Sequence, residues 1–167
     1  MQWRQDGSTL YFSDRLNESS NLSAVPDAIV AAAAASTDGR ATLDFLGVPI
    51  GNSTGILKWI RMLAKTPTPI SYRNAPAWLV EQFNCIRDFL KGDVLVESIL
   101  ARFYDPETDS NHVICLRLGH ELPLLESYKG FDPGRVTADG RKLAPDFDET
   151  YFSFIAANFA RLRRIVP

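Results

Sequence analysis

Strand-like and helix-like segments alternate along the N-terminal part of the chain, and this alternation restricts the fold more than any other feature. Helical patterns cover residues 23–36, 55–65 and 76–90, and short apolar runs at 41–48 and 70–72 lie between them. Parallel strands need long connections, which are usually helices that cross over in the right-handed sense. The pattern therefore predicts an α/β fold built on a mostly parallel sheet.

A β-hairpin is predicted at the N-terminus. The residues on both sides of Asp6-Gly7 alternate in polarity, and Asp-Gly is typical of a type I′ hairpin turn. The hairpin adds an antiparallel pair to the parallel strands. We therefore expect a mixed β-sheet with helices packed mainly on one face.

The C-terminal part has a different pattern. Strand-like residues 93–104 and 112–119 flank the turn-rich sequence DPETDSN. The signal then weakens until residues 146–164, where an acidic start and a basic end are typical of a helix. We expect two parts: an α/β domain over residues 1–104, and a hairpin-and-helix extension over 105–167 packed on or next to it.

Composition restricts the class of partner. The formal net charge of −2 and the 23% of charged residues give no general attraction to nucleic acids or acidic membranes. Arg161, Arg163 and Arg164 fall where basic residues complement the C-terminus of a helix. Any binding surface must therefore be local, and we expect neither a nucleic acid nor a membrane as the partner.

The sequence also lacks the signals of export and of membrane insertion. It begins without a basic and apolar leader, and no run reaches the ~18 apolar residues of a membrane-spanning helix. We expect a cytoplasmic protein. Cys85 and Cys115 are too few for a disulfide framework, and Cys85 falls in a helical pattern where we expect a buried structural thiol.

No group of residues predicts an enzyme or a metal site. In an extended strand at about 3.3 Å per residue, His112 and His120 would lie ~26 Å apart, and Cys115 would face the opposite side. Ser53 is centred in a Gly-x-Ser-x-Gly spacing, GNSTG at residues 51–55, but only His112 and His120 are present to serve as its base, and no glycine-rich phosphate loop is present. We expect no catalytic residue, no metal and no cofactor.

Residues 49–65, PIGNSTGILKWIRMLAK, place an asparagine and two hydroxyl residues directly before a helical pattern. One interpretation is that Asn52, Ser53 and Thr54 only cap the helix, because all three residue types are good N-caps. The other is a binding site, because sites in α/β sheets form where strands end and helices begin. A basic stripe on the same helix is either a solvated face or part of the site. It consists of Lys58, Arg61 and Lys65.

The segment LDFLGVPIGNSTGILKWIRML, residues 43–63, resembles the STAS domain of bacterial anti-sigma factor antagonists. In that family a strand with a Leu-Asp-Leu-like pattern leads to Asp-Ser-Ser/Thr-Gly and a helix. The resemblance covers residues 1–104, through the hairpin and the passages LNESSNLSAV and ISYRNAPAWLVEQFN. It implies a small α/β sheet packed against helices, in a protein that is not an enzyme. Such a domain binds a protein partner, and in many systems a partner kinase phosphorylates it.

The resemblance assigns roles to individual residues. Ser53 falls on the phospho-acceptor, Thr54 on the second hydroxyl and Gly55 on the glycine, while Asn52 stands where the family usually has Asp. A phosphate on Ser53 would add about −1.5 to −2 charge to the contact surface and so repel an acidic partner. The expected partner-binding residues are Asn52, Thr54, Gly55, Lys58 and Arg61.

The C-terminal third has a second resemblance. Some STAS-like bacterial proteins carry, after the last core strand, a zinc-ribbon-like hairpin with two CxxC pairs and then a Phe-Asp-Asp-rich helix. The passages FYDPETDSNHVICLRLG and DGRKLAPDFDETYFSFI occupy matching positions here, without the cysteines. The resemblance implies a hairpin held by packing and turns instead of a metal.

The leading hypothesis is a STAS-like protein-interaction module in bacterial signalling or regulation, with Ser53 as a phospho-switch. Its expected partner is a regulatory protein of the anti-sigma or kinase-like type, and a homodimer is an alternative assembly. The alternative function is an accessory small-molecule or lipid-binding domain, because STAS-like domains also occur attached to transporters and lipid-transport machinery. A third hypothesis is a scaffold without a switch.

Overall fold

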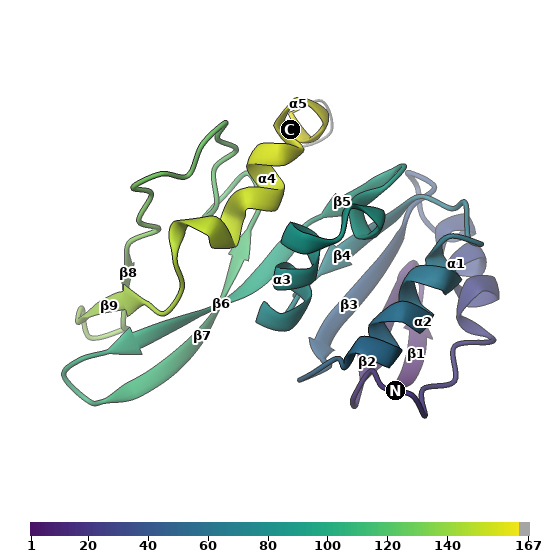
Figure 1. Cartoon of the computed structure of the whole chain (residues 1–167), viewed down its shortest axis with the longest axis horizontal. Coiled ribbons are helices and arrows are strands. Elements are labelled where there is room, and N and C mark those ends of the chain that lie inside the picture. The colour runs from purple at the N-terminus through teal and green to yellow at the C-terminus, as the bar shows by residue number, and fades with distance from the viewer. Residues whose placement is uncertain (164–167) are drawn as a thin grey trace. The chain divides into compact units, whose positions relative to one another are not determined.

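The chain folds into two compact units that divide between Glu97 and Ser98. The structure, a computed structural model of the whole chain (Figure 1), describes residues 1–163. We call residues 1–97 unit 1 and the residues from Ser98 onward unit 2. The division expected after residue 104 falls inside a strand of unit 2.

Glu97 is the last residue of unit 1 that hydrogen-bonds to its sheet. Its backbone N–H donates to the Tyr72 carbonyl at 2.8 Å, and its carboxylate accepts a hydrogen bond from the Ser71 hydroxyl. The single strand predicted across this point is therefore two strands. They are β5 (Val94–Val96) in unit 1 and β6 (Ser98–Asp105) in unit 2.

Unit 1 contains a five-stranded mixed sheet with the strand order β1-β2-β3-β4-β5. The first four strands are β1 (Gln2–Asp6), β2 (Thr9–Ser13), β3 (Ala41–Gly47) and β4 (Ile70–Arg73). β1 pairs antiparallel with β2, and the other neighbours pair in parallel. The prediction of an α/β fold with a mixed sheet is confirmed.

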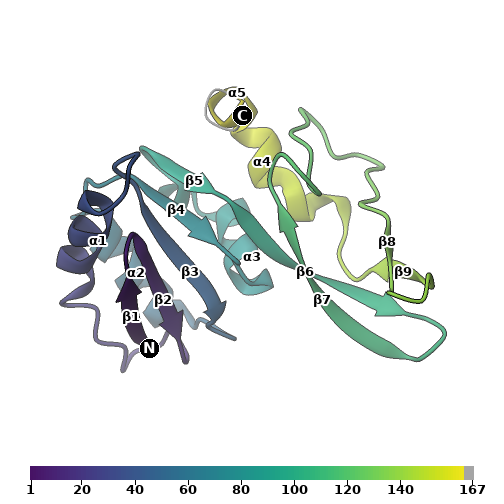
Figure 2. The same cartoon turned by 180° about the vertical axis from the view of Figure 1, so that it is seen from behind.

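Three helices connect the parallel strands of unit 1. They are α1 (Val25–Ala34), α2 (Ser53–Leu63) and α3 (Ala77–Cys85). When parallel strands follow chain order, successive right-handed crossovers place their helices on the same face of the sheet. α2 and α3 lie in front of the strands in Figure 1 and behind them in the reverse view of Figure 2, whereas α1 lies at the edge of the sheet on the side of β1.

The N-terminal hairpin forms as predicted, with Asp6 opposite Thr9, but its turn is of another type. Gly7 has a φ angle of 55°, whereas Ser8 is not in the positive-φ region. A type I′ turn needs positive φ at both central residues, so the predicted turn type is wrong.

Aromatic side chains fill the space between the sheet and the helices of unit 1. The ring of Phe45 on β3 lies 5.2 Å from those of Phe12 and Trp59, measured between centroids. The Trp59 indole N–H on α2 donates to the Tyr72 hydroxyl at 3.2 Å, and burial raises the pKa of Tyr72. Trp59 is fully buried, so it fastens α2 to the sheet. Truncating such a ring to alanine typically costs about 3–5 kcal/mol.

The third predicted helix is broken near its end. Ile86 leaves the helical region with φ −123° and ψ 103°, and the 3₁₀ helix η1 (Arg87–Leu90) follows. The break brings the rings of Phe83 and Phe89 to a centroid distance of 5.9 Å. Cys85, the last residue of α3, is exposed, so the prediction of a buried thiol is wrong.

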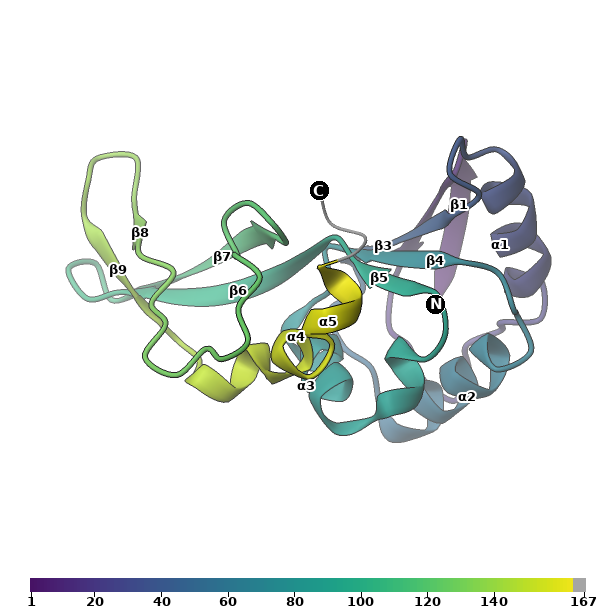
Figure 3. The ribbon, with the colours of Figure 1, turned by 90° about the horizontal axis from the view of Figure 1, so that it is seen from above.

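Unit 2 contains a four-stranded antiparallel sheet with the order β7-β6-β9-β8. Its other strands are β7 (Ser110–Arg117), β8 (Arg135–Val136) and β9 (Lys142–Pro145). The 3₁₀ helix η2 (Glu149–Phe152) and the short helix α4 (Ser153–Ala157) run beside β6 (Figure 3), where the Tyr151 hydroxyl donates to the Leu100 carbonyl at 2.9 Å.

An ion pair joins the end of β6 to Arg141, the residue directly before β9. The Asp105 side chain is fully buried, and the Arg141 guanidinium pairs with it at 2.5 Å. The other carboxylate oxygen of Asp105 accepts a hydrogen bond from the Glu107 backbone N–H at 2.9 Å. Burial acts to raise the pKa of Asp105, but the Glu107 N–H, the Thr108 hydroxyl and the charge of Arg141 outweigh it and lower the pKa.

The helix predicted over residues 146–164 is not continuous. After η2 and α4, the helical conformation is interrupted at Asn158, and α5 (Phe159–Leu162) follows. The Asn158 side-chain amide donates to the Phe154 carbonyl at 2.7 Å. Of the three C-terminal arginines, Arg164 lies outside the described residues.

Candidate functional site

The loop before α2 is held in place by backbone contacts to the segment after β2. The Leu16 N–H donates to the Ile50 carbonyl at 3.0 Å, and the Asn52 N–H donates to the Leu16 carbonyl at 2.9 Å. On the other side, the Trp78 indole N–H donates to the Val48 carbonyl at 3.1 Å. The loop therefore leaves the carboxyl end of β3 in a defined conformation.

Asn52 is the residue that caps α2. Its side-chain oxygen accepts the Gly55 N–H at 2.9 Å, and its side-chain amide donates to the Glu18 carboxylate at 2.7 Å. The Asn52 hydrogen bond is the largest cause of a lowered pKa at Glu18. Because Asn52 performs the capping, Ser53 and Thr54 are not needed for it.

Two glycines allow close approaches at this loop. A Cβ atom on Gly55 would lie 2.5 Å from the Leu16 carbonyl carbon and 2.6 Å from the Asn17 nitrogen, and a Cβ atom on Gly51 would lie 2.6 Å from the Trp78 ring. Gly55 is buried, and the packing of α2 requires a residue without a side chain at this position. Gly55 therefore offers no side chain to a partner.

Ser53 and Thr54 are both exposed at the first turn of α2. Within residues 1–163, neither hydroxyl makes a hydrogen bond to the protein. The N-terminus of a helix is favourable for negative charge, because its first N–H groups have no partner within the helix. The Ser53 hydroxyl is therefore accessible at a position that tolerates a phosphate.

A groove between α2 and α3 begins at Ser53 and has a volume of about 440 Å³. We call it the α2–α3 groove. Its walls carry no charged side chain, and they include Ile56, Leu57, Ile60, Gln82 and Ile86. Leu57 of this lining is 46% exposed, and Leu46 and Ile50, earlier in the same segment, are 66% and 51% exposed. These three are half of the large exposed hydrophobic residues found in the described chain. Such a concentration in one short segment is typical of an interaction surface.

The basic residues of the expected contact set lie on another flank of α2. Lys58 and Arg61 line a different groove with Lys65, beside residues 20–26 and away from the lining of the α2–α3 groove. The structure therefore brings Asn52, Thr54 and Ser53 together at the helix start and separates the basic residues from Ser53.

A carboxylate that sequence reasoning did not single out organises the end of β3. Asp44 is buried, and it accepts hydrogen bonds from Arg73 at 2.9 Å, Asn74 at 3.0 Å and the Leu46 N–H at 2.9 Å. Burial acts to lower the pKa of Arg73, but the hydrogen bond and charge of Asp44 outweigh it and raise the pKa. Three hydrogen bonds to the protein hold this buried carboxylate, so its role is structural.

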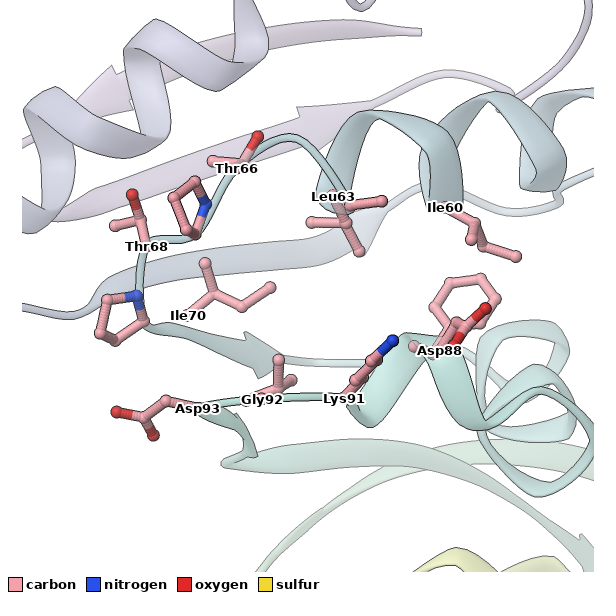
Figure 4. Close-up of a pocket in the computed structure, with 14 residues that line it drawn as sticks. Ile60, Leu63, Thr66, Thr68, Ile70, Asp88, Lys91, Gly92 and Asp93 are labelled. Carbon is pink, nitrogen blue, oxygen red and sulfur yellow. The ribbon is translucent and has the colours of Figure 1, made fainter.

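A further pocket of about 390 Å³ lies at the opposite end of the sheet, where β4 and β5 begin. Figure 4 shows Ile60 and Leu63 of α2 on one wall and Asp88 and Lys91 on the facing wall. Asp93 at its edge is already paired with Arg40 at 2.6 Å. The pocket brings no nucleophile and base together, so it supports no catalytic assignment.

The residues considered for a metal are dispersed. His112 and Cys115 lie on opposite faces of β7, and His120 lies in the turn after it. In the part of the chain that the structure describes, no group of three or more His, Cys, Asp or Glu side chains could hold a metal ion.

No helix within residues 1–163 combines the length and the apolar character needed to cross a membrane. Comparisons with models of protein families, with curated proteins and with solved structures found no match to this chain.

Proposed function

We propose that unit 1 is a STAS-like protein-interaction module in bacterial regulation. It binds a regulatory protein through the exposed hydrophobic residues of segment 46–57, and phosphorylation of Ser53 weakens that binding. The observation that carries the proposal is the accessible Ser53 hydroxyl, which makes no hydrogen bond within residues 1–163, at the edge of the apolar α2–α3 groove.

The local geometry supports a switch that acts on binding more than on stability. Asn52 caps α2, so a change at Ser53 leaves the cap in place. A negative charge at the helix start gains about 0.3–1 kcal/mol from the helix dipole. The same charge beside Leu57 must be desolvated when an apolar partner surface covers it, which costs about 2–5 kcal/mol of binding free energy if it is left unpaired.

The test is capture of a partner from a lysate of the host bacterium by immobilised protein. We expect the wild type and Ser53→Ala to capture the same regulatory protein, whereas Ser53→Asp and Leu57→Asp lose it. Thermal melts of all forms establish that each variant is folded. Ser153→Asp is the matched control, because Ser153 is an exposed serine at the start of α4.

The captured protein is then titrated against the purified variants. If the Ala and Asp forms at residue 53 bind it equally well, Ser53 is not a switch. If Leu57→Asp also binds unchanged, segment 46–57 is not the contact surface and the proposed function fails.

A further inference from the structure

The other flank of α2 forms a second groove with a different chemistry. This groove has a volume of about 480 Å³ and lies between α2 and the segment that leads into α1. We call it the basic groove. The basic stripe of Lys58, Arg61 and Lys65 lines it from α2, and Ser20, Asn21 and Ser23 line it from the facing segment.

The lining of the basic groove carries positive charge only. It contains no carboxylate, and α2 contains no acidic residue. Within residues 1–163, none of its three cations has a carboxylate oxygen within 4.0 Å, whereas Arg40 and Arg73 of the same unit are both paired. The α2–α3 groove is uncharged and the pocket of Figure 4 contains charges of both signs, so the basic groove differs from both.

One of the cations is held in position by the backbone. The Lys58 ammonium donates to the carbonyl oxygens of Glu18 and Ser20. These contacts fix one wall of the groove. The Glu18 carboxylate, which lies outside the lining and accepts a hydrogen bond from Asn52, also interacts electrostatically with Lys58. Arg61 and Lys65 are therefore the cations left for an anionic ligand. Arg61 and Lys65 are exposed and can close on a bound anion.

The lining favours a soluble ligand over a membrane surface. Its apolar members are Leu22 and Met62, which are 9% and 7% exposed, and the half-buried Pro26. None of the large exposed hydrophobic residues of the described chain belongs to it. Binding to a lipid surface normally adds apolar side chains that enter the bilayer. Polar walls around a cationic centre are instead what a small phosphorylated molecule needs.

We propose that the basic groove binds a soluble organophosphate, with its phosphate groups against Arg61 and Lys65 and its polar groups toward Asn21 and Ser23. This inference goes beyond the proposed function and uses the opposite flank of α2. Either one can therefore fail without the other.

The test is a titration of the full chain with inorganic pyrophosphate, in which the amide chemical shifts of the protein are measured at each addition. We expect saturable shifts at residues 20–26 and 58–65 that weaken as salt is added. Arg61→Gln and Lys65→Gln should each weaken binding about tenfold, as the loss of one charge-assisted hydrogen bond would. Arg87→Gln, which removes an exposed arginine outside the groove, should leave the affinity unchanged.

Two further probes distinguish other sources of negative charge. Vesicles of phosphatidylcholine with phosphatidylglycerol test a lipid surface, and a glutamate-rich peptide tests an acidic protein segment. Tighter binding to either than to pyrophosphate overturns the proposal, and so does an equal effect of Arg87→Gln and Arg61→Gln. A spectrum unchanged by pyrophosphate overturns it as well.

Discussion

At the scale of single residues, the structure gives Asn52 a role that an aspartate could fill only in part. Asn52 uses its oxygen to cap α2 and its amide to bind Glu18. An aspartate retains the first interaction only, because it has no N–H to donate. Asn52 and Glu18 therefore form a matched pair, although they are far apart in the sequence. No local pattern could have predicted this pairing.

Asn52→Asp should lower the free energy of unfolding, because it removes the donor and sets two carboxylates against each other. It should also raise the pKa of Glu18, which the Asn52 hydrogen bond now lowers. Glu18→Gln should restore stability when it is combined with Asn52→Asp, but should not increase it in the wild type. Urea unfolding of the four forms measures this coupling, and additive effects would show that the two residues act independently.

Glu121 should make unit 2 sensitive to acid. The Arg117 side chain and backbone N–H hold the pKa of Glu121 at about 2, against an ordinary value of 4.5. Between these values the unfolded chain binds more protons than the folded chain, so stability falls as the pH falls through this range. Glu121→Gln should remove that part of the acid dependence. The measurement is fluorescence-detected unfolding at pH values from 5 to 2. Glu126→Gln, in the same loop, is the control and should retain it.

At the scale of elements, the long periodic segments could be predicted and the interruptions could not. The strand before the motif and α2 both appear where expected, because apolar periodicity reports which face is buried. The break at Ile86 accompanies the contact of the Phe83 and Phe89 rings, and at the break at Asn158 the side-chain amide donates to the backbone. Apolar periodicity reports neither contact. Leu57 of α2 is 46% exposed, since the sheet covers only the side of the helix that carries Trp59.

The packing of α2 against residues 16 and 17 depends on the absence of a side chain at Gly55. In Gly55→Ala the new methyl group meets backbone atoms of Leu16 and Asn17, which cannot rotate away. We expect a loss of about 1–3 kcal/mol in the free energy of unfolding, as for other overpacked sites. Ser53→Ala, two residues earlier at an exposed position, should change it by less than about 0.5 kcal/mol. Denaturant unfolding compares the two, and equal losses would mean that the contact with Leu16 is relaxed without cost.

At the scale of the whole molecule, the sequence predicts two parts but places their boundary inside β6. A continuous strand pattern runs through Glu97, and only the hydrogen bonds of Glu97 to Tyr72 and Ser71 show that one sheet ends there. β6 then pairs with β7 and β9, both of which lie later in the chain. Pairing over such distances in sequence is not contained in local propensity.

The two boundaries predict different behaviour for two fragments. Residues 1–97 contain every strand of the first sheet, so this fragment should fold alone, as a monomer with a cooperative melt. Residues 1–104 add most of β6 without its partners, and expose Ile99 and Phe103, which are fully buried in the whole chain. An unpaired apolar strand invites pairing between chains, so we expect this longer fragment to self-associate and to bind a hydrophobic dye. Light scattering after gel filtration separates the outcomes. A monomeric 1–104 fragment as stable as 1–97 would show that β6 does not depend on β7 and β9.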